Sequence, residues 1–109
     1  MRAQITFLSG SRAGQTSIFS QPHVTIGRHP QCELQFDPEA DLDVSSRHAT
    51  IRLEGALYVL RDLGSTNGTL VNGRRLGGDH VLASKDVIQF GPNGPQIRFT
   101  AIGDSRPSP

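Results

Sequence analysis

The sequence predicts an all-β domain, folded as an antiparallel β-sandwich. Apolar and polar residues alternate in many short runs, and turn-forming residues recur roughly every 8 to 12 residues, as in sandwich folds. In addition, 12 glycines and 7 prolines distributed over 109 residues leave no uninterrupted stretch for a long helix. A chain of this length can bury one core but not two, so we expect a single domain over residues 1–102.

The first half of the chain contains four of the expected strands. Alternation over 3–7 and 16–19, with a glycine-rich break between them, predicts a hairpin. A further alternating segment over 24–26 and a short apolar one over 34–36 predict the next two strands. The acidic stretch 37–43 has room for at most one helical turn, so we expect an exposed loop there.

The second half contains the clearest strand signals. Residues 48–53 alternate cleanly, and a Glu54-Gly55 turn joins them to the apolar run 57–63, which predicts an antiparallel pair. Asn72-Gly73 predicts a two-residue hairpin turn, because both residues tolerate positive φ. The remaining predicted strands, which bring the total to roughly ten, lie at Leu70-Val71, Leu76, Val81-Leu82, Ile88 to Phe90 and Ile97 to Phe99.

Composition limits the classes of partner and the cellular setting. Eleven basic and ten acidic residues give a net charge of +1, and aromatic residues are scarce, so we expect no nucleic-acid binding. We also expect no membrane association, because no apolar run approaches the roughly 20 residues that cross a bilayer. A single cysteine, Cys32, and a start without a signal peptide predict a cytoplasmic protein. Residues 103–109 have the composition of a flexible linker.

Three polar loops are the candidate functional site. They are Gly27-Arg28, the segment Ser45-Ser46-Arg47-His48, and Gly64-Ser65-Thr66-Asn67-Gly68. Antiparallel pairing of the strands places the second and third loops side by side, and sandwich folds collect loops at their two ends. Together the loops contain guanidinium, hydroxyl and amide donors and no carboxylate, a composition suited to a dianionic phosphate ester.

Catalysis and metal binding have no candidate in the sequence. Ser45 and His48 lack both a Gly-x-Ser-x-Gly elbow and an aspartate placed to orient the imidazole. The only lysine, Lys85, is not in a phosphate-binding loop of the Gly-x-x-x-x-Gly-Lys type. With one cysteine and scattered histidines, no spacing typical of metal ligands emerges. We therefore expect a protein that is not an enzyme and that carries no metal and no cofactor.

The ordered set of motifs resembles the forkhead-associated (FHA) domain. The resemblance rests on Gly27-Arg28, on Ser45-x-x-His48, on the run from Asp62 to Gly73, and on Asp86 to Gly91, and covers the chain from about Ile5 to Phe99. It implies an eleven-stranded antiparallel β-sandwich with binding loops at one end, which binds phosphothreonine peptides through arginine-mediated recognition. The implied partner is a phosphothreonine-containing protein, a substrate of a Ser/Thr protein kinase.

The resemblance also implies a role for each residue of the loops. Arg28 and Ser45 would bind the phosphate, Arg47 would supplement them, Thr66 would supply a second phosphate-side donor, and Asn67 would hold the peptide backbone. Gly27, His48 and Gly68 would support the site.

Each of these residues also has a purely structural interpretation. Ser45 could merely shape a turn, and Asn67-Gly68 could form a turn without any role in binding. The alternative function is a phosphate-independent interaction or self-association module on the same fold, using a sheet face with Arg52, Tyr58 and Arg61. The acidic loop 37–43 departs from the family pattern and would favour basic residues next to the phosphothreonine.

Overall fold

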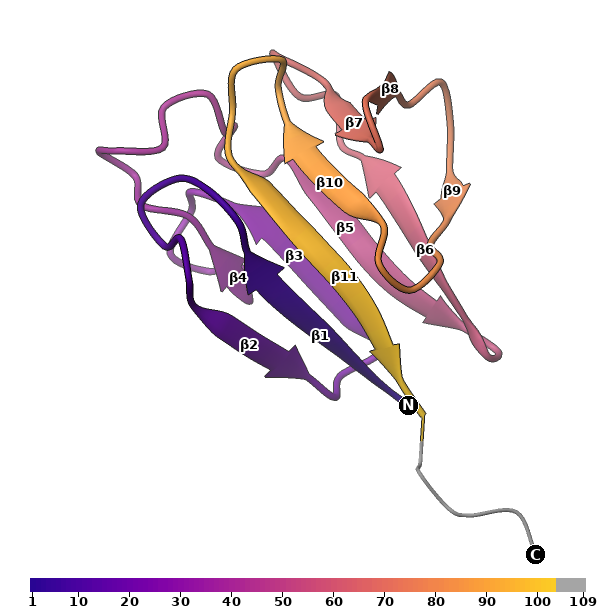
Figure 1. Ribbon diagram of the computed structural model, residues 1–109. Helices are drawn as coiled ribbons and strands as arrows, with labels where there is room; N and C mark the ends of the chain where they lie inside the picture. Colours follow the sequence, from indigo (N-terminus) through magenta and orange to yellow (C-terminus); the bar gives the residue numbers. More distant parts are fainter. Residues whose placement is uncertain (104–109) are drawn as a thin grey trace, which may run out of the picture.

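Eleven strands form two β-sheets that pack face to face in the computed structural model, which describes residues 1–103 (Figure 1). The first sheet has the strand order β2-β1-β11-β10-β7-β8, and the second has the order β4-β3-β5-β6-β9. The strands are β1 (Arg2–Phe7), β2 (Thr16–Phe19), β3 (His23–Gly27), β4 (Leu34–Gln35), β5 (Ala49–Glu54), β6 (Leu57–Asp62), β7 (Thr69–Val71), β8 (Arg74–Arg75), β9 (His80–Val81), β10 (Val87–Phe90) and β11 (Gln96–Ile102). The predicted all-β sandwich is therefore confirmed.

The three predicted hairpins are present. β1 pairs antiparallel with β2, and β5 pairs antiparallel with β6 from Ala49 opposite Asp62 to Glu54 opposite Leu57. Asn72-Gly73 joins β7 to β8 with positive φ at both residues, 51° and 84°. The backbone N–H of Asn72 donates to the Val87 carbonyl, which ties this turn to β10.

Three details differ from the sequence prediction. β4 lies parallel to β3, because residues 28–33 loop back and bring Leu34 beside Ile26 before the chain resumes the direction of β3. Leu76 lies outside any strand, just beyond β8, where its N–H donates to the Thr69 carbonyl and its side chain packs against the core. Phe36 follows β4 as a buried loop residue. The predicted linker, except for Gly103, lies outside the described residues.

Aromatic side chains fill the core beneath the loop end of the sandwich. The ring centroids of Phe7 and Phe36 lie 5.6 Å apart, and those of Phe36 and Phe90 lie 5.1 Å apart. Each ring is almost completely buried, and burial of one such side chain stabilises the fold by about 1.5–3 kcal/mol. This rigid layer supports the loops above it. No helix within residues 1–103 has the length and apolarity needed to span a membrane.

Candidate functional site

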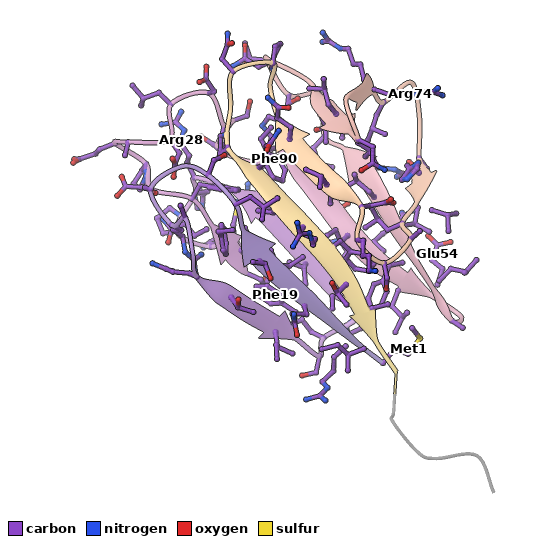
Figure 2. All side chains as sticks on the ribbon, in the orientation of Figure 1. Met1, Phe19, Arg28, Glu54, Arg74 and Phe90 are labelled. Atoms are coloured by element: carbon purple, nitrogen blue, oxygen red, sulfur yellow. The ribbon has the colours of Figure 1, made fainter. Side chains whose placement is uncertain are left out.

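A shallow hollow of about 270 Å³ lies where the three polar loops meet, at the end of the sandwich away from the N-terminus (Figures 1 and 2). It is lined by Arg28 from the β3–β4 loop, by Leu42 to Ser46 before β5, and by Thr66 and Asn67 from the β6–β7 loop. Segments that lie up to 39 positions apart in the sequence therefore share one surface.

Backbone contacts fix the first two loops against each other. The N–H of Arg28 donates to the Ser45 carbonyl at 3.2 Å, and the N–H of His29 donates to the Ser46 carbonyl at 3.0 Å. Gly27 makes this approach possible, because a Cβ atom there would lie 2.1 Å from the Ser46 carbonyl oxygen. The predicted supporting role of Gly27 thus has a direct steric basis in the structure.

The Arg28 guanidinium is held by backbone carbonyls and not by a carboxylate. Its Nε donates to the Val44 carbonyl, and its Nη1 donates to the Pro38 carbonyl at 2.8 Å. Within residues 1–103 it forms no ion pair, so its positive charge is not neutralised by a neighbour. The remaining N–H groups of Nη1 and Nη2 are available to an incoming oxyanion.

Ser45 connects the second loop to the third. Its hydroxyl oxygen accepts the backbone N–H of Thr66 at 3.1 Å. The hydroxyl hydrogen of Ser45 is not needed for this bond and can be donated elsewhere. The side chain of Thr66 itself is exposed at the rim of the hollow.

His48 lies beneath the loops, where it is completely buried. Its Nδ1 accepts the backbone N–H of Ser45 at 3.0 Å, so the imidazole is the Nε2–H tautomer and donates to the Gly68 carbonyl at 2.8 Å. Burial lowers the pKa of His48. The hydrogen bond to the Gly68 carbonyl and the nearby charge of Asp62 act in the opposite direction, but their effect on the pKa is smaller. The neutral ring packs edge-on against Phe90 and links the second loop to the third from below.

Asp62 organises the third loop, a role that the sequence prediction did not assign. Its carboxylate accepts hydrogen bonds from the N–H groups of Gly64 and Ser65 and from the hydroxyls of Ser65 and Thr69. Burial alone would raise the pKa of Asp62, but these hydrogen bonds hold it below its ordinary value. An aspartate two residues before a glycine in a turn is the sequence signal for this arrangement.

Asn67 and Gly68 complete the third loop. The Asn67 amide Nδ2 donates to the Asp43 carbonyl at 2.9 Å, which leaves its side-chain carbonyl oxygen available. Gly68 has a φ of +82°, and the Arg75 guanidinium occupies the space that a side chain would need. The Ser65 hydroxyl accepts the N–H of Gly68, so this residue is fixed from several sides.

Of the five residues predicted to bind the phosphopeptide, Arg47 is the one that lies apart from the hollow. Its guanidinium is exposed and donates to the Gln31 side chain at 3.4 Å, and it does not line the cavity. The structure instead adds Leu42 and Asp43 to the lining, residues to which the sequence prediction gave no individual role. Residues 1–103 contain no cluster of three or more potential metal ligands.

The fold and the loop cluster define a β-sandwich that presents an anion-suited surface at one end. The family model for the FHA domain matches residues 24–91, which include all three loops. The chain therefore belongs to the FHA domain family, and the resemblance of its motifs to that family is confirmed.

Curated relatives and a solved structure agree with this assignment. Over 82 residues the chain is 43% identical to glycogen accumulation regulator GarA of Mycolicibacterium smegmatis and 40% identical to the oxoglutarate dehydrogenase inhibitor of Corynebacterium efficiens. These matches cover 75% of this chain but 49% and 55% of the relatives, so the chain spans about half their length. It also matches a solved chain from work on phosphothreonine-dependent FHA domain interactions, with a TM-score of 0.79, 32% identity, and 94% and 99% of the two chains covered.

Proposed function

We propose that this chain is a phosphothreonine-binding adaptor that recruits a phosphorylated protein, the substrate of a Ser/Thr kinase. One observation carries the proposal: three chain-distant loops surround a hollow in which two backbone carbonyls hold the Arg28 guanidinium, which has no ion-pair partner among residues 1–103. A guanidinium held in this way is pre-organised for a phosphate, because little ordering energy is lost on binding. The domain proposed for this function is residues 1–102, in a cytoplasmic setting.

In the proposed complex the phosphate lies between Arg28 and Ser45, with the third loop closing the far side. Ser45 donates its hydroxyl hydrogen to a phosphate oxygen while it still accepts the Thr66 N–H. The exposed Thr66 hydroxyl supplies another donor, and Asn67 holds the peptide backbone next to the phosphothreonine. Arg47 contributes at longer range by its charge, since it does not line the hollow.

The same geometry supports binding without catalysis. Both ring nitrogens of His48 are occupied by backbone partners, and the ring is buried, so it is not available as a base for the Ser45 hydroxyl. We therefore propose that the protein acts by recruiting partners and not by modifying them.

The proposal is tested by measuring binding of a fluorescent phosphothreonine peptide and its unphosphorylated form. Replacing Arg28 with Gln should weaken phosphopeptide binding by about 10- to 150-fold, the equivalent of about 1.5–3 kcal/mol for a hydrogen bond to a charged group. Arg2→Gln is the matched control, because Arg2 is exposed at the opposite end of the sandwich. Equal binding of the two peptides by the wild-type protein would refute the proposal.

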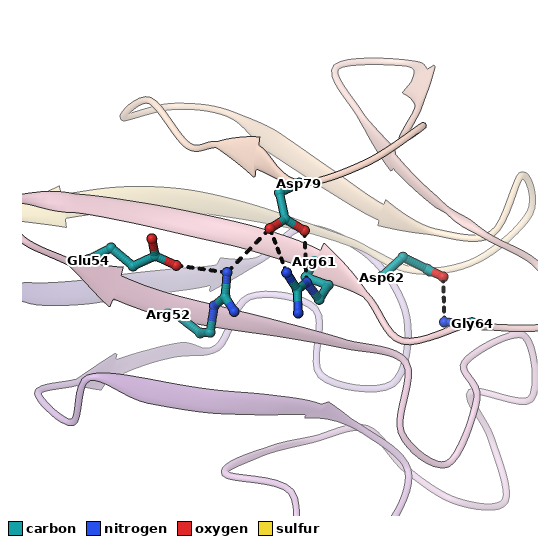
Figure 3. A network of polar contacts seen from close by, with 6 residues as sticks. All are labelled: Arg52, Glu54, Arg61, Asp62, Gly64 and Asp79. Carbon is teal, nitrogen blue, oxygen red and sulfur yellow. Dashed lines mark hydrogen bonds and ion pairs between the residues drawn. The ribbon is translucent and has the colours of Figure 1, made fainter.

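The phosphate-independent alternative receives no support from the face that suggested it. Tyr58 is buried against Phe99 in the core and is not on that face, which corrects the sequence prediction. Arg61 is exposed and Arg52 is half-buried there, and both pair with Asp79 (Figure 3). Their charges are therefore already compensated within the fold.

A further inference from the structure

We infer that the preferred ligand carries a lysine or arginine close to the phosphothreonine, and that Leu42 and Asp43 recognise this basic side chain. The inference rests on the proposed function and identifies a specificity determinant within the same site. Leu42 and Asp43 line the hollow but have no role in the proposed binding of the phosphate.

Asp43 is the first of these residues. Its backbone carbonyl is used by Asn67, but its carboxylate is exposed and has no hydrogen bond or ion pair with the described part of the chain. It lines the same hollow as Arg28 and Ser45. A carboxylate in this place repels a dianionic phosphate, so for a ligand without a compensating charge it is a cost.

With a basic side chain in the ligand, Asp43 strengthens binding instead of weakening it. A cation near Asp43 gains an ion pair there, and its charge also screens the carboxylate from the phosphate. Asp37 and Glu39 are exposed on the same loop but do not line this hollow, so Asp43 is the carboxylate that a ligand cation would meet there. The charges of site and ligand would then match in order: Arg28 faces the phosphate, and Asp43 faces the basic side chain of the peptide.

Leu42 supplies the second, independent observation. It is the most exposed of the large apolar side chains in the described part of the chain, at 67%, and it lies beside the carboxylate instead of in the core. Lysine and arginine have apolar stems and a charged end, and these stems pack on apolar surface while the charge stays in water. An adjacent leucine and aspartate therefore match the two chemical parts of a basic side chain better than they match an aliphatic or an acidic one.

The position of the pair indicates where the ligand chain runs. Leu42 and Asp43 line both the phosphate hollow and a neighbouring hollow of about 280 Å³, whose far side is formed by Asn93 to Pro95 in the β10–β11 loop. An extended peptide that leaves the phosphate hollow in this direction passes the pair within its next few residues, since a strand advances roughly 3.3 Å per residue. The basic residue should accordingly lie within about three positions of the phosphothreonine.

The test uses phosphothreonine peptides with alanine at the flanking positions and a single lysine moved through each position from three before to three after the phosphothreonine. Fluorescence anisotropy at low ionic strength gives Kd for the wild-type domain, Asp43→Asn, Leu42→Ala and Glu39→Gln. Glu39→Gln is the matched control, since it removes the same charge from the same loop at a residue outside both hollows.

For the wild-type domain we expect lysine at one or two positions to tighten binding by about 1.5- to 5-fold, the range of an exposed ion pair. Asp43→Asn should abolish that preference and also tighten binding of the all-alanine phosphopeptide, because the repulsion is removed. Leu42→Ala should reduce the preference without that second effect, and Glu39→Gln should retain it. In high salt the preference should shrink for every protein that shows it in low salt.

The outcomes separate this inference from the proposed function. If the wild-type domain binds the all-alanine phosphopeptide but shows no lysine preference, or if Asp43→Asn keeps that preference, the inference is wrong and the proposed function stands. If the wild-type domain does not distinguish phosphorylated from unphosphorylated peptides at any lysine position, both are wrong.

Discussion

At the scale of single residues, the site depends on side chains that each make two kinds of contact. Ser45 accepts one loop N–H while its own hydrogen stays free, and Asn67 donates to one loop carbonyl while its oxygen stays free. Each of them holds the scaffold with one group and leaves another free for the proposed ligand. Such residues keep their rotamers without bound peptide, which reduces the entropy lost on binding.

Replacing Ser45 with Ala should separate these two contributions. The phosphate loses a donor, so affinity for a phosphothreonine peptide should fall by about tenfold or more. The free energy of unfolding should change by less than about 1 kcal/mol, because Thr66 is exposed and water can replace the lost acceptor. Calorimetric titration and urea denaturation measure the two quantities.

Ser20→Ala is a suitable control for this change, since Ser20 is exposed just after β2. Unchanged affinity in Ser45→Ala would show that its hydroxyl serves only the loop and does not contact the phosphate.

At the scale of elements, the sequence predicts where the strands lie far better than it predicts whether neighbouring strands run parallel or antiparallel. Alternation over residues 48–53 and a two-residue turn at 72–73 fix local geometry, so both features were predictable. The parallel pairing of β3 with β4 was not predictable, because it depends on how residues 28–33 loop back to bring Leu34 beside Ile26. Tyr58 was misplaced because it was grouped with Arg61, although residues three positions apart on a strand point to opposite faces. In the register of the pair, Tyr58 lies opposite Leu53, which packs against the core.

The site was predictable to a similar degree. Residue types in ordered motifs indicated Arg28, Ser45, Thr66 and Asn67, and these four line one hollow in the structure. The lining role of Leu42 and Asp43 depends on the path of the acidic loop, which no periodicity describes. The glycine two residues after Asp62 indicated a turn. The four hydrogen bonds of the Asp62 carboxylate depend on the folded loop around it and could not be predicted.

The packing of the β3–β4 loop against residues 45–46 gives a prediction at the same scale. Gly27→Ala would put a Cβ atom 2.1 Å from the Ser46 carbonyl oxygen, so the loops must separate. We expect a loss of about 1–3 kcal/mol in the free energy of unfolding, together with weaker phosphopeptide binding as Ser45 moves away from Arg28.

Gly77→Ala serves as the comparison in the same denaturation series, because no atom lies within 4 Å of a Cβ atom at that position. Its stability should stay within about 0.5 kcal/mol of the wild-type value. A Gly27→Ala protein as stable as Gly77→Ala would show that the two loops are not rigidly packed.

At the scale of the whole molecule, two half-buried carboxylates and one buried imidazole make the stability of the fold depend on pH in two separate windows. The carboxylates of Asp62 and Asp86 have pKa values lowered by hydrogen bonds that outweigh the effect of burial. Their contribution is present above the ordinary value of 3.8 and is lost as pH falls below it. Any loss of stability at higher pH must come from another group.

His48 accounts for the pH dependence of stability in the higher pH range, just below 6.5. Its pKa in the folded protein is lowered from the ordinary 6.5 by burial, so above that pH the ring is neutral in both the folded and the unfolded chain. Below it the unfolded chain takes up a proton that the folded protein resists, and the free energy of unfolding falls with decreasing pH. The slope should approach about 1.4 kcal/mol per pH unit until the folded pKa is reached.

Urea denaturation of the domain without ligand at pH 7, 6 and 5 measures this slope. Because no peptide is present, the second ionisation of a phosphothreonine, with a pKa of about 6, does not contribute. His48→Gln should be less stable at pH 7, because the loops lose their buried link, yet its stability should change less between pH 7 and 5 than that of the wild-type protein. His23→Gln, an exposed histidine at the start of β3, should keep the wild-type slope. A wild-type domain equally stable at pH 7 and pH 5 would contradict the assignment of a neutral, buried imidazole beneath the binding loops, whether or not His48→Gln folds.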